Sequence, residues 1–224
     1  MKEVLISINP KWCEPIASGI KTVEARKTRP MLETPFKVRI YCTKGRGDCL
    51  WRWNGIWYDT QDPSHRPNRL DGKIIGEFVC DKIEDFYCAS VPYREKNNLG
   101  YGKFIDNGVY KVEGYHEGIV FEKNDRYIDS MLKNSDLENM CLSAQEIFEY
   151  IGIGKHLYAW HISDLVIYDK PRELSEFHKP CEDMRNCLNK AFRESGHSLN
   201  KCFDCGCRIT RPPQSWCYVE GSAE

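Results

Sequence analysis

The sequence predicts an α+β fold, built mainly of strands with short flanking helices, and three stretches carry this prediction. Residues 36–42 alternate strictly between apolar and polar side chains, which is the pattern of a half-buried strand. Residues 156–168 form a second, longer strand region. The third stretch, Pro10 to Gly19, fits a short helix with proline in its first turn and glycine at its C-terminal cap.

Two further strands are predicted in the N-terminal part of the chain. Residues 4–8 and 22–27 are predicted strands on either side of the short helix. In the strand of residues 36–42 the alternation assigns one set of side chains to the core and the other set to solvent. The set that we expect in solvent is Lys37, Arg39 and Tyr41.

Further strands and one helix are expected between the two long strands. The predicted strands lie at residues 74–83, 108–112 and 118–121. Ser143 and Glu146 have the spacing of a capping box, in which each residue satisfies a backbone amide of the other. This spacing predicts a helix over residues 144–150, which ends at Gly152.

A Trp-rich insertion interrupts the pattern at about residues 45–72. The pair Asn54-Gly55 favours a type I′ turn and therefore predicts a hairpin. Trp51 and Trp53 are candidates for stacking on a nucleobase, because an aromatic face accepts any base. The alternative is that these rings pack on the sheet below them. The residues leave both interpretations open.

The composition changes after the second long strand. We therefore expect one domain over residues 1–170, which contains the insertion, and a Cys-rich extension over residues 171–224. Cys202, Cys205 and Cys207 have a spacing at which two thiolates can meet one metal ion, and Cys181 is a candidate fourth ligand. A structural zinc ion that folds the extension is one interpretation. Reduced, partly buried thiols are the other.

The composition indicates in which cellular compartment we expect the protein. The 224 residues are 29% charged and 41% hydrophobic, as in an ordinary soluble domain. No apolar run approaches the roughly 20 residues that span a bilayer, and the N-terminus lacks the pattern of a signal peptide. We therefore expect a cytoplasmic protein without a membrane partner, in which twelve cysteines are thiols or metal ligands rather than disulfides.

A local basic patch is the expected source of any contact with nucleic acid, because the formal net charge of the chain is only −1. The patch begins at Lys21, Glu24 and Arg26. On a regular strand Glu24 and Arg26 share a face that Lys21 does not, unless the chain bends after Gly19. One interpretation is recognition, with Glu24 accepting from an exocyclic amine and a cation holding phosphate. The other is an ion network that stabilises the fold.

The motif Gly-x-Lys-x-x-Glu-x-Arg at residues 19–26, the basic strand after it and the Trp160-His161-Ile162 strand before Pro171 resemble the ASCH family. ASCH domains belong to the PUA-like superfamily, so the resemblance implies a small mixed β-barrel. It also implies a cleft that contains the motif and binds RNA or a nucleoside or nucleotide ligand. The expected ligand contacts are Lys21, Glu24, Arg26, Arg29, Trp51 and Trp53.

An enzyme is the alternative that the resemblance offers. One bacterial branch of the family hydrolyses N4-acetylcytidine with a lysine, a threonine and a glutamate. Lys21 matches the lysine, Glu24 stands at the threonine position, and Glu138 is a candidate for the glutamate. Without a hydroxyl nucleophile, Glu24 would activate water and Lys21 would stabilise the oxyanion. We therefore expect binding of RNA or a modified nucleotide, with an amidohydrolase of N4-acetylcytidine-like nucleosides as the alternative.

A protein-interaction adaptor, docking through a zinc-stabilised extension, is a third hypothesis, and metal analysis tests its premise. If the cysteines hold a structural site, the purified protein contains about one zinc ion per chain. A variant that lacks residues 171–224 then loses the metal. Elemental mass spectrometry of both proteins measures this, and a fully folded, zinc-free protein contradicts the hypothesis.

Overall fold

The computed structural model describes residues 2–44, 50–53, 56–59, 70–92, 104–105, 109–111, 119–123, 126–129, 132, 134–152, 155–180 and 208–220. The chain divides into two compact units. Unit 1 contains residues 1–17, 35–79 and 164–224, and unit 2 contains residues 18–34 and 80–163. This division does not follow the predicted boundary between residues 170 and 171. The C-terminal segment and the N-terminal strand share unit 1.

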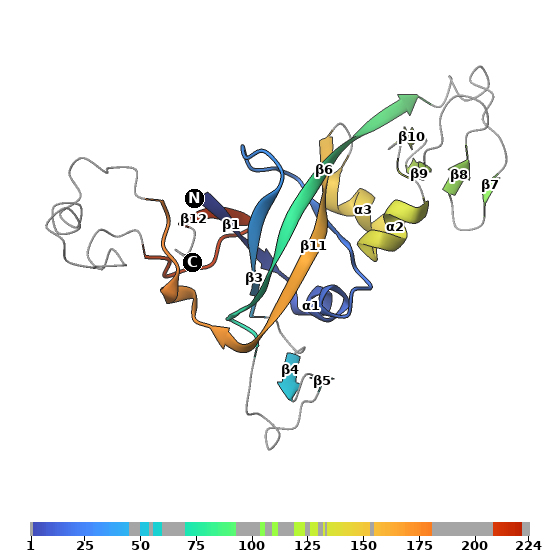
Figure 1. Ribbon diagram of the computed structural model, residues 1–224. Coiled ribbons are helices and arrows are strands. Elements are labelled where there is room, and N and C mark those ends of the chain that lie inside the picture. Colours follow the sequence, from blue (N-terminus) through green and yellow to red (C-terminus); the bar gives the residue numbers. More distant parts are fainter. Residues whose placement is uncertain are drawn as a thin grey trace, which may run out of the picture. The chain divides into compact units, whose positions relative to one another are not determined.

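Unit 1 is organised around the N-terminal strand. β1 (Lys2–Ile8) pairs in parallel with β3 (Phe36–Cys42) and antiparallel with β12 (Trp216–Glu220). The order continues from β3 to β6 (Ile74–Pro92), whose first residues belong to this unit. In Figure 1 the red β12 lies beside the dark blue β1. The two ends of the chain therefore form neighbouring strands.

The remaining elements of unit 1 connect these strands. α1 (Pro10–Ala17) begins at the predicted proline, and Gly19 after it has a φ of +75°. β4 (Leu50–Trp53) pairs antiparallel with β5 (Ile56–Asp59), which confirms the hairpin predicted at residues 54–55. The side chains of Trp51 and Trp53 lie outside the described residues, so both interpretations of these rings stay predictions.

The described part of the C-terminal segment belongs to the core of unit 1. Val219 on β12 is fully buried with Leu5 of β1. Leu174 and Phe177, in and after the short 3₁₀ helix Leu174–Glu176, join the same cluster. This cluster also contains Tyr41, Ile74 and Ile209. The described part of the extension predicted at residues 171–224 therefore supplies apolar core residues to unit 1.

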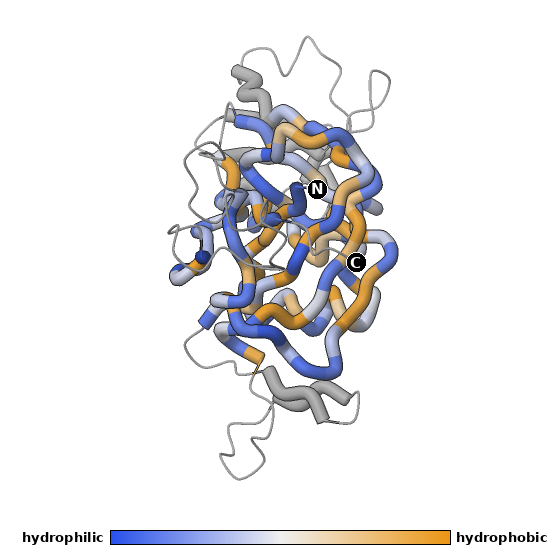
Figure 2. Tube along the Cα trace, turned by 60° about the vertical axis from the view of Figure 1, so that its left-hand side comes forward, coloured by the Kyte–Doolittle hydropathy of each residue, from blue (hydrophilic) through white to orange (hydrophobic). Residues whose placement is uncertain are grey.

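The strand predicted at residues 36–42 is confirmed as β3, but its second face is not in solvent. Arg39 is 4% exposed and Tyr41 is 3% exposed. Tyr41 packs with Leu5 and Ile74. Alternation of apolar and polar residues predicted a half-buried strand, whereas neighbours on both faces bury every residue of β3 except Lys37, which is partly exposed. Figure 2 shows the apolar stretches of the strands in orange, while the connections between them are mostly blue.

Unit 2 combines a sheet with two helices. The later residues of β6 pair with β10 (Arg126–Asp129), and the order continues through β9 (Ile119–Lys123), β8 (Val109–Lys111) and β7 (Phe104–Ile105). The predicted strands at residues 108–112 and 118–121 are thus confirmed. β11 (Lys155–Arg172) pairs with β6 and, on its other side, with β2 (Val23–Arg26).

The helices α2 (Asn134–Met140) and α3 (Ala144–Ile151) cover one face of β2 and β11. The capping box is confirmed, because the amide of Ser143 donates to Glu146 at 2.9 Å and the amide of Glu146 donates to Ser143 Oγ at 3.2 Å. Helix α3 ends at Gly152, which has a φ of +82°. The apolar core under both helices consists of Val23, Ala25, Leu132, Met140, Ile147, Ile151, Leu157 and Ala159.

Parallel and antiparallel pairs occur together with short helices, so the mixed α+β fold is confirmed. The strand order in the described ranges is open, running from β12 to β6 in unit 1 and from β6 to β7 in unit 2. A closed barrel stays a prediction. None of the helices in the described part of the chain is long and apolar enough to cross a membrane.

The burial of β12 predicts that its apolar side chain stabilises the fold. Val219→Ala leaves a cavity against Leu5 and should lower the free energy of unfolding by about 2 kcal/mol. The neighbouring exposed Glu220→Ala serves as the control and should change the free energy of unfolding by less than about 0.5 kcal/mol. Urea denaturation measures both values. Equal stability of the two variants contradicts the place of β12 in the core.

Candidate functional site

The motif after Gly19 places two opposite charges on one face of β2. In the antiparallel pairing with β11, Glu24 lies opposite Trp160 and Arg26 lies opposite Tyr158. Val23 and Ala25 point to the other face, where they join the core under the helices. Glu24 and Arg26 therefore share the face of the strand opposite to Val23 and Ala25, as the alternation of a strand predicts.

Lys21 lies before the strand begins, and its side chain joins these charges. Its ammonium donates to the carbonyl of Val23 at 2.9 Å and to the carbonyl of Met140 at 2.6 Å. The same Nζ lies 3.4 Å from Glu24 Oε2. An ammonium has three donors, and these acceptors match them in number. On a regular strand the side chains of Lys21 and Glu24 would lie on opposite faces. The chain bends after Gly19, and this bend brings Lys21 to the carboxylate of Glu24.

Arg26 completes a charged triad of Lys21, Glu24 and Arg26. One guanidinium nitrogen of Arg26 lies 3.0 Å from Glu24 Oε1, so each oxygen of the carboxylate meets a different cation. Backbone hydrogen bonds hold Thr22 on both sides. The amide of Thr22 donates to the carbonyl of Asn139, and the carbonyl of Thr22 accepts from the amide of Ile162. The triad carries a formal charge of +1 in sum.

The triad lies in packed protein. Lys21 is 2% exposed, Glu24 is 6% exposed and Arg26 is 7% exposed. We expected these side chains to line an open cleft, and the structure encloses them instead. Exposed residues adjoin the triad at both ends, because Ile20 and Thr22 flank Lys21 and Lys27 follows Arg26 in the chain. At the Arg26 end the exposed neighbour is a cation.

Tyr150 of α3 stands at this end, and sequence analysis missed it. Its hydroxyl hydrogen bonds with the Arg26 side chain and the Lys27 backbone. Lys27 Nζ lies 4.6 Å from the centre of the ring. Burial raises the pKa of Tyr150 above its ordinary value, although Arg26 acts in the opposite direction. The hydroxyl is therefore neutral near pH 7. The only signal in the sequence was the place of Tyr150 in the predicted helix.

The other predicted site residues differ in their surroundings. Glu138 is exposed on α2, and the residue of that stretch that reaches Lys21 is Met140, through its carbonyl. Arg29 is exposed after β2. Burial raises the pKa of the Cys80 thiol to about 12, whereas the positive charge of Arg29 has a smaller effect and lowers this pKa. A thiol with this pKa is protonated at neutral pH and is a poor nucleophile.

The zinc hypothesis concerns residues outside the described part. Cys181, Cys202, Cys205 and Cys207 all lie there, so the structural zinc site remains a proposal. Within the described residues no group of three or more His, Cys, Asp or Glu side chains is arranged to hold a metal. Cys13, Cys42, Cys80, Cys141 and Cys217 form no disulfide.

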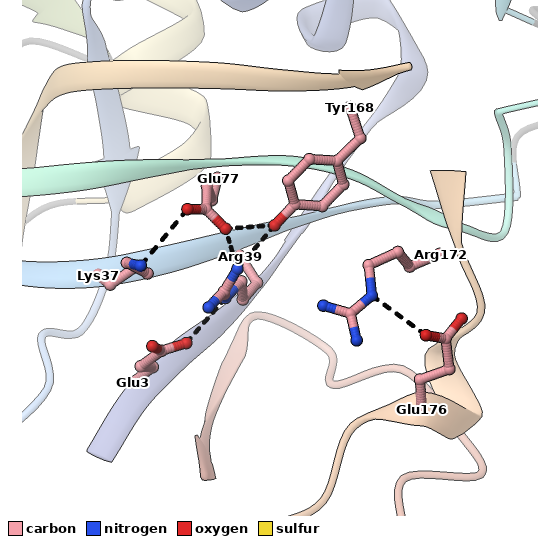
Figure 3. A network of polar contacts seen from close by, with 7 residues as sticks. All are labelled: Glu3, Lys37, Arg39, Glu77, Tyr168, Arg172 and Glu176. Carbon is pink, nitrogen blue, oxygen red and sulfur yellow. Dashed lines mark hydrogen bonds and ion pairs between the residues drawn. The ribbon is translucent and has the colours of Figure 1, made fainter. Parts of the chain in front are cut away.

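Unit 1 contains a second polar cluster, centred on Arg39 (Figure 3). Arg39 Nε donates to Glu3 at 2.7 Å, and another nitrogen of the same guanidinium donates to Glu77 and to the Tyr168 hydroxyl. Tyr168 also donates to Glu77, and Lys37 lies 3.5 Å from the same carboxylate. These contacts explain why Arg39 is buried although the alternation of β3 predicted it in solvent. They join β1, β3, β6 and β11.

No family model and no curated protein sequence matches the chain. Among solved structures, an ASCH protein of Zymomonas mobilis is similar at 16% identity, over 97% of this chain and 87% of the other, with a TM-score of 0.40. Its tyrosine-to-phenylalanine mutant matches at 15% identity over 98% and 91%, with a TM-score of 0.43. Its serine-to-alanine mutant matches at 15% identity over 97% and 88%, with a TM-score of 0.42.

The chain is thus similar to ASCH domain structures, as the motif led us to expect. At TM-scores this low a superposition does not assign roles to single residues. The roles of Lys21, Glu24 and Arg26 therefore rest on the contacts described above.

The triad predicts that loss of its one carboxylate destabilises the fold. Glu24→Gln leaves two buried cations without their shared counter-charge and should lower the free energy of unfolding by about 3 kcal/mol. Glu138→Gln removes an exposed carboxylate and is the matched control, with an expected change below about 0.5 kcal/mol. Urea denaturation of both variants at low salt measures the difference. A Glu24→Gln protein as stable as the control contradicts the ion network.

Proposed function

We propose that the chain binds RNA or a nucleotide at the Arg26 end of the charged triad. The observation that carries the proposal is the arrangement of one carboxylate between two cations, with a formal charge of +1, next to the exposed Lys27 and the half-exposed Tyr150. A surplus positive charge held in packed protein favours an anionic partner, since an opposite charge offsets the cost of its burial.

Arg26 is suited to a phosphate because its guanidinium presents donors in a planar fork. Glu24 and the Tyr150 hydroxyl hold that fork in one orientation. A donor fixed before the ligand arrives loses little conformational entropy on binding. Glu24 thus positions Arg26. Because Glu24 is buried, it is not the main residue that contacts a nucleobase.

Exposed cations extend this end of the triad. Lys27 and Arg29 follow β2 directly, and both are exposed. Two such charges next to a fixed guanidinium form a local basic surface on a chain whose net charge is −1. Contacts of this kind with the phosphate backbone supply affinity without base specificity.

The state of Lys21 favours binding over hydrolysis. In the amidohydrolase mechanism Lys21 would donate to a developing oxyanion. Its donors already meet two backbone carbonyls and Glu24, and it is almost completely enclosed. Donation to a substrate would break one of these contacts in the interior. Lys21 therefore acts as a structural centre for the triad.

Binding to RNA should depend on salt and on the two exposed cations. For a fluorescent single-stranded RNA, the double variant Lys27→Ala/Arg29→Ala should reduce the slope of log affinity against log salt by about 1.4, because each phosphate contact on a single strand contributes about 0.7. Lys11→Ala removes an exposed cation from α1 in unit 1 and is the control. Fluorescence anisotropy at several salt concentrations measures the slopes. No binding by the unmodified protein, or equal slopes for all three proteins, contradicts the proposal.

A further inference from the structure

Three rings form a row on the sheet of unit 2. His156 and Tyr158 of β11 stack with their ring centres 6.0 Å apart and their planes 14° apart. Tyr87 of β6 also contacts His156, with ring centres 5.0 Å apart and planes tilted by 52°. We call Tyr87, His156 and Tyr158 the aromatic row. It is independent of the tryptophans in the insertion.

The aromatic row lies on the same face of the sheet as the charged triad. Tyr158 is the cross-strand partner of Arg26, so the two side chains project from the same face. His156 is two residues before Tyr158 and shares this face, whereas Leu157 between them joins the core under α2 and α3. The helices thus cover one face, and the row occupies the other.

The outer part of the row is accessible. Tyr87 is 50% exposed and the side chain of His156 is 48% exposed. The His156 ring is nevertheless held in place, because its Nδ1 lies 2.6 Å from Asp85 of β6. Stacking on a base requires accessible ring surface, and a ring that is already held in place loses little side-chain entropy on binding.

Exposed cations gather at the same end of the sheet. Because β2 and β11 are antiparallel, residues after Arg26 run toward residues before Tyr158. Lys27 and Arg29 therefore extend toward the end where β11 begins at Lys155, and all three cations are exposed. Rings with cations beside them match the chemistry of a strand of nucleic acid, which carries base faces and phosphates at regular spacing.

We infer that the aromatic row is a stacking platform for unpaired bases of single-stranded RNA, whose phosphates lie against Lys27, Arg29 and Lys155. The inference rests on the proposed function and names its substrate class. In a duplex the base faces are already stacked on one another, so a double strand offers this surface only its phosphates. The platform therefore selects single strands, whereas the cations alone do not.

An RNA without bases separates the two contributions. The probes are a fluorescent single-stranded RNA octamer and an octamer of the same phosphates in which abasic residues replace the nucleosides. Tyr87→Ala and His156→Ala should each weaken binding of the RNA octamer about tenfold. Neither change should alter binding of the abasic octamer. Tyr87→Phe and His156→Phe keep a ring and should restore most of the affinity.

A second readout reports stacking directly. In the octamer, 2-aminopurine in place of one base should lose fluorescence when the unmodified protein binds, and should not when Tyr87→Ala binds at saturating concentration. Circular dichroism and thermal melting of each variant exclude unfolding as the cause of weaker binding. Exposed rings such as Tyr87 are the least costly to replace.

Failure of the platform and failure of the proposed function give different results. If the protein binds both octamers equally and the alanine variants change neither affinity, the platform is wrong and RNA binding through the cations stands. If the unmodified protein binds neither octamer, both inferences are wrong. Equal affinity for the octamer and its duplex likewise overturns the platform.

Discussion

The buried ammonium of Lys21 is the constraint on which unit 2 depends. A cation removed from water is stable only where acceptors replace its hydration, and the chain supplies two backbone carbonyls and one carboxylate. These acceptors come from the start of β2, from Glu24 and from the end of α2. One side chain thus fixes the strand against the helix. Gly19, two residues before Lys21, has the left-handed backbone of a helix C-terminal cap, which glycine adopts without strain.

A chain of side-chain contacts runs from Lys21 toward the surface. Lys21 fixes Glu24, Glu24 fixes Arg26, and Arg26 meets the Tyr150 hydroxyl and shares a face with Tyr158. Burial decreases along the same path, from an almost fully enclosed ammonium to the half-exposed ring of Tyr87. A rigid interior with an accessible rim is the arrangement that lets a site bind without first rearranging. In the proposed function Lys21 and Glu24 contribute through the orientation that they give to Arg26.

Sequence analysis succeeded where a signal is local and failed where it depends on distant strands. Pro10, Gly19 and the Ser143 capping box define helix ends through their own backbone chemistry, and the structure confirms each of them. The burial of Arg39 and Tyr41 required knowledge of Glu3, Glu77 and Leu5, which no pattern within β3 contains. The same holds for the pairing of β12 with β1.

The site shows the same division. The triad was visible as a motif because its members are five residues apart at most. The contacts of Tyr150 with Arg26 and of Tyr87 with His156 form only in the tertiary structure. One signal was present and overlooked. His156, Tyr158 and Trp160 place rings at every second position of a predicted strand, which assigns them to one face.

The two ion clusters differ in net charge, and this difference supports the proposed site. Arg39 and Lys37 are balanced by Glu3 and Glu77, so that cluster is neutral in sum and serves to join strands. In the triad two cations share one carboxylate, and the surplus charge lies beside exposed rings, where a phosphate with its base satisfies both.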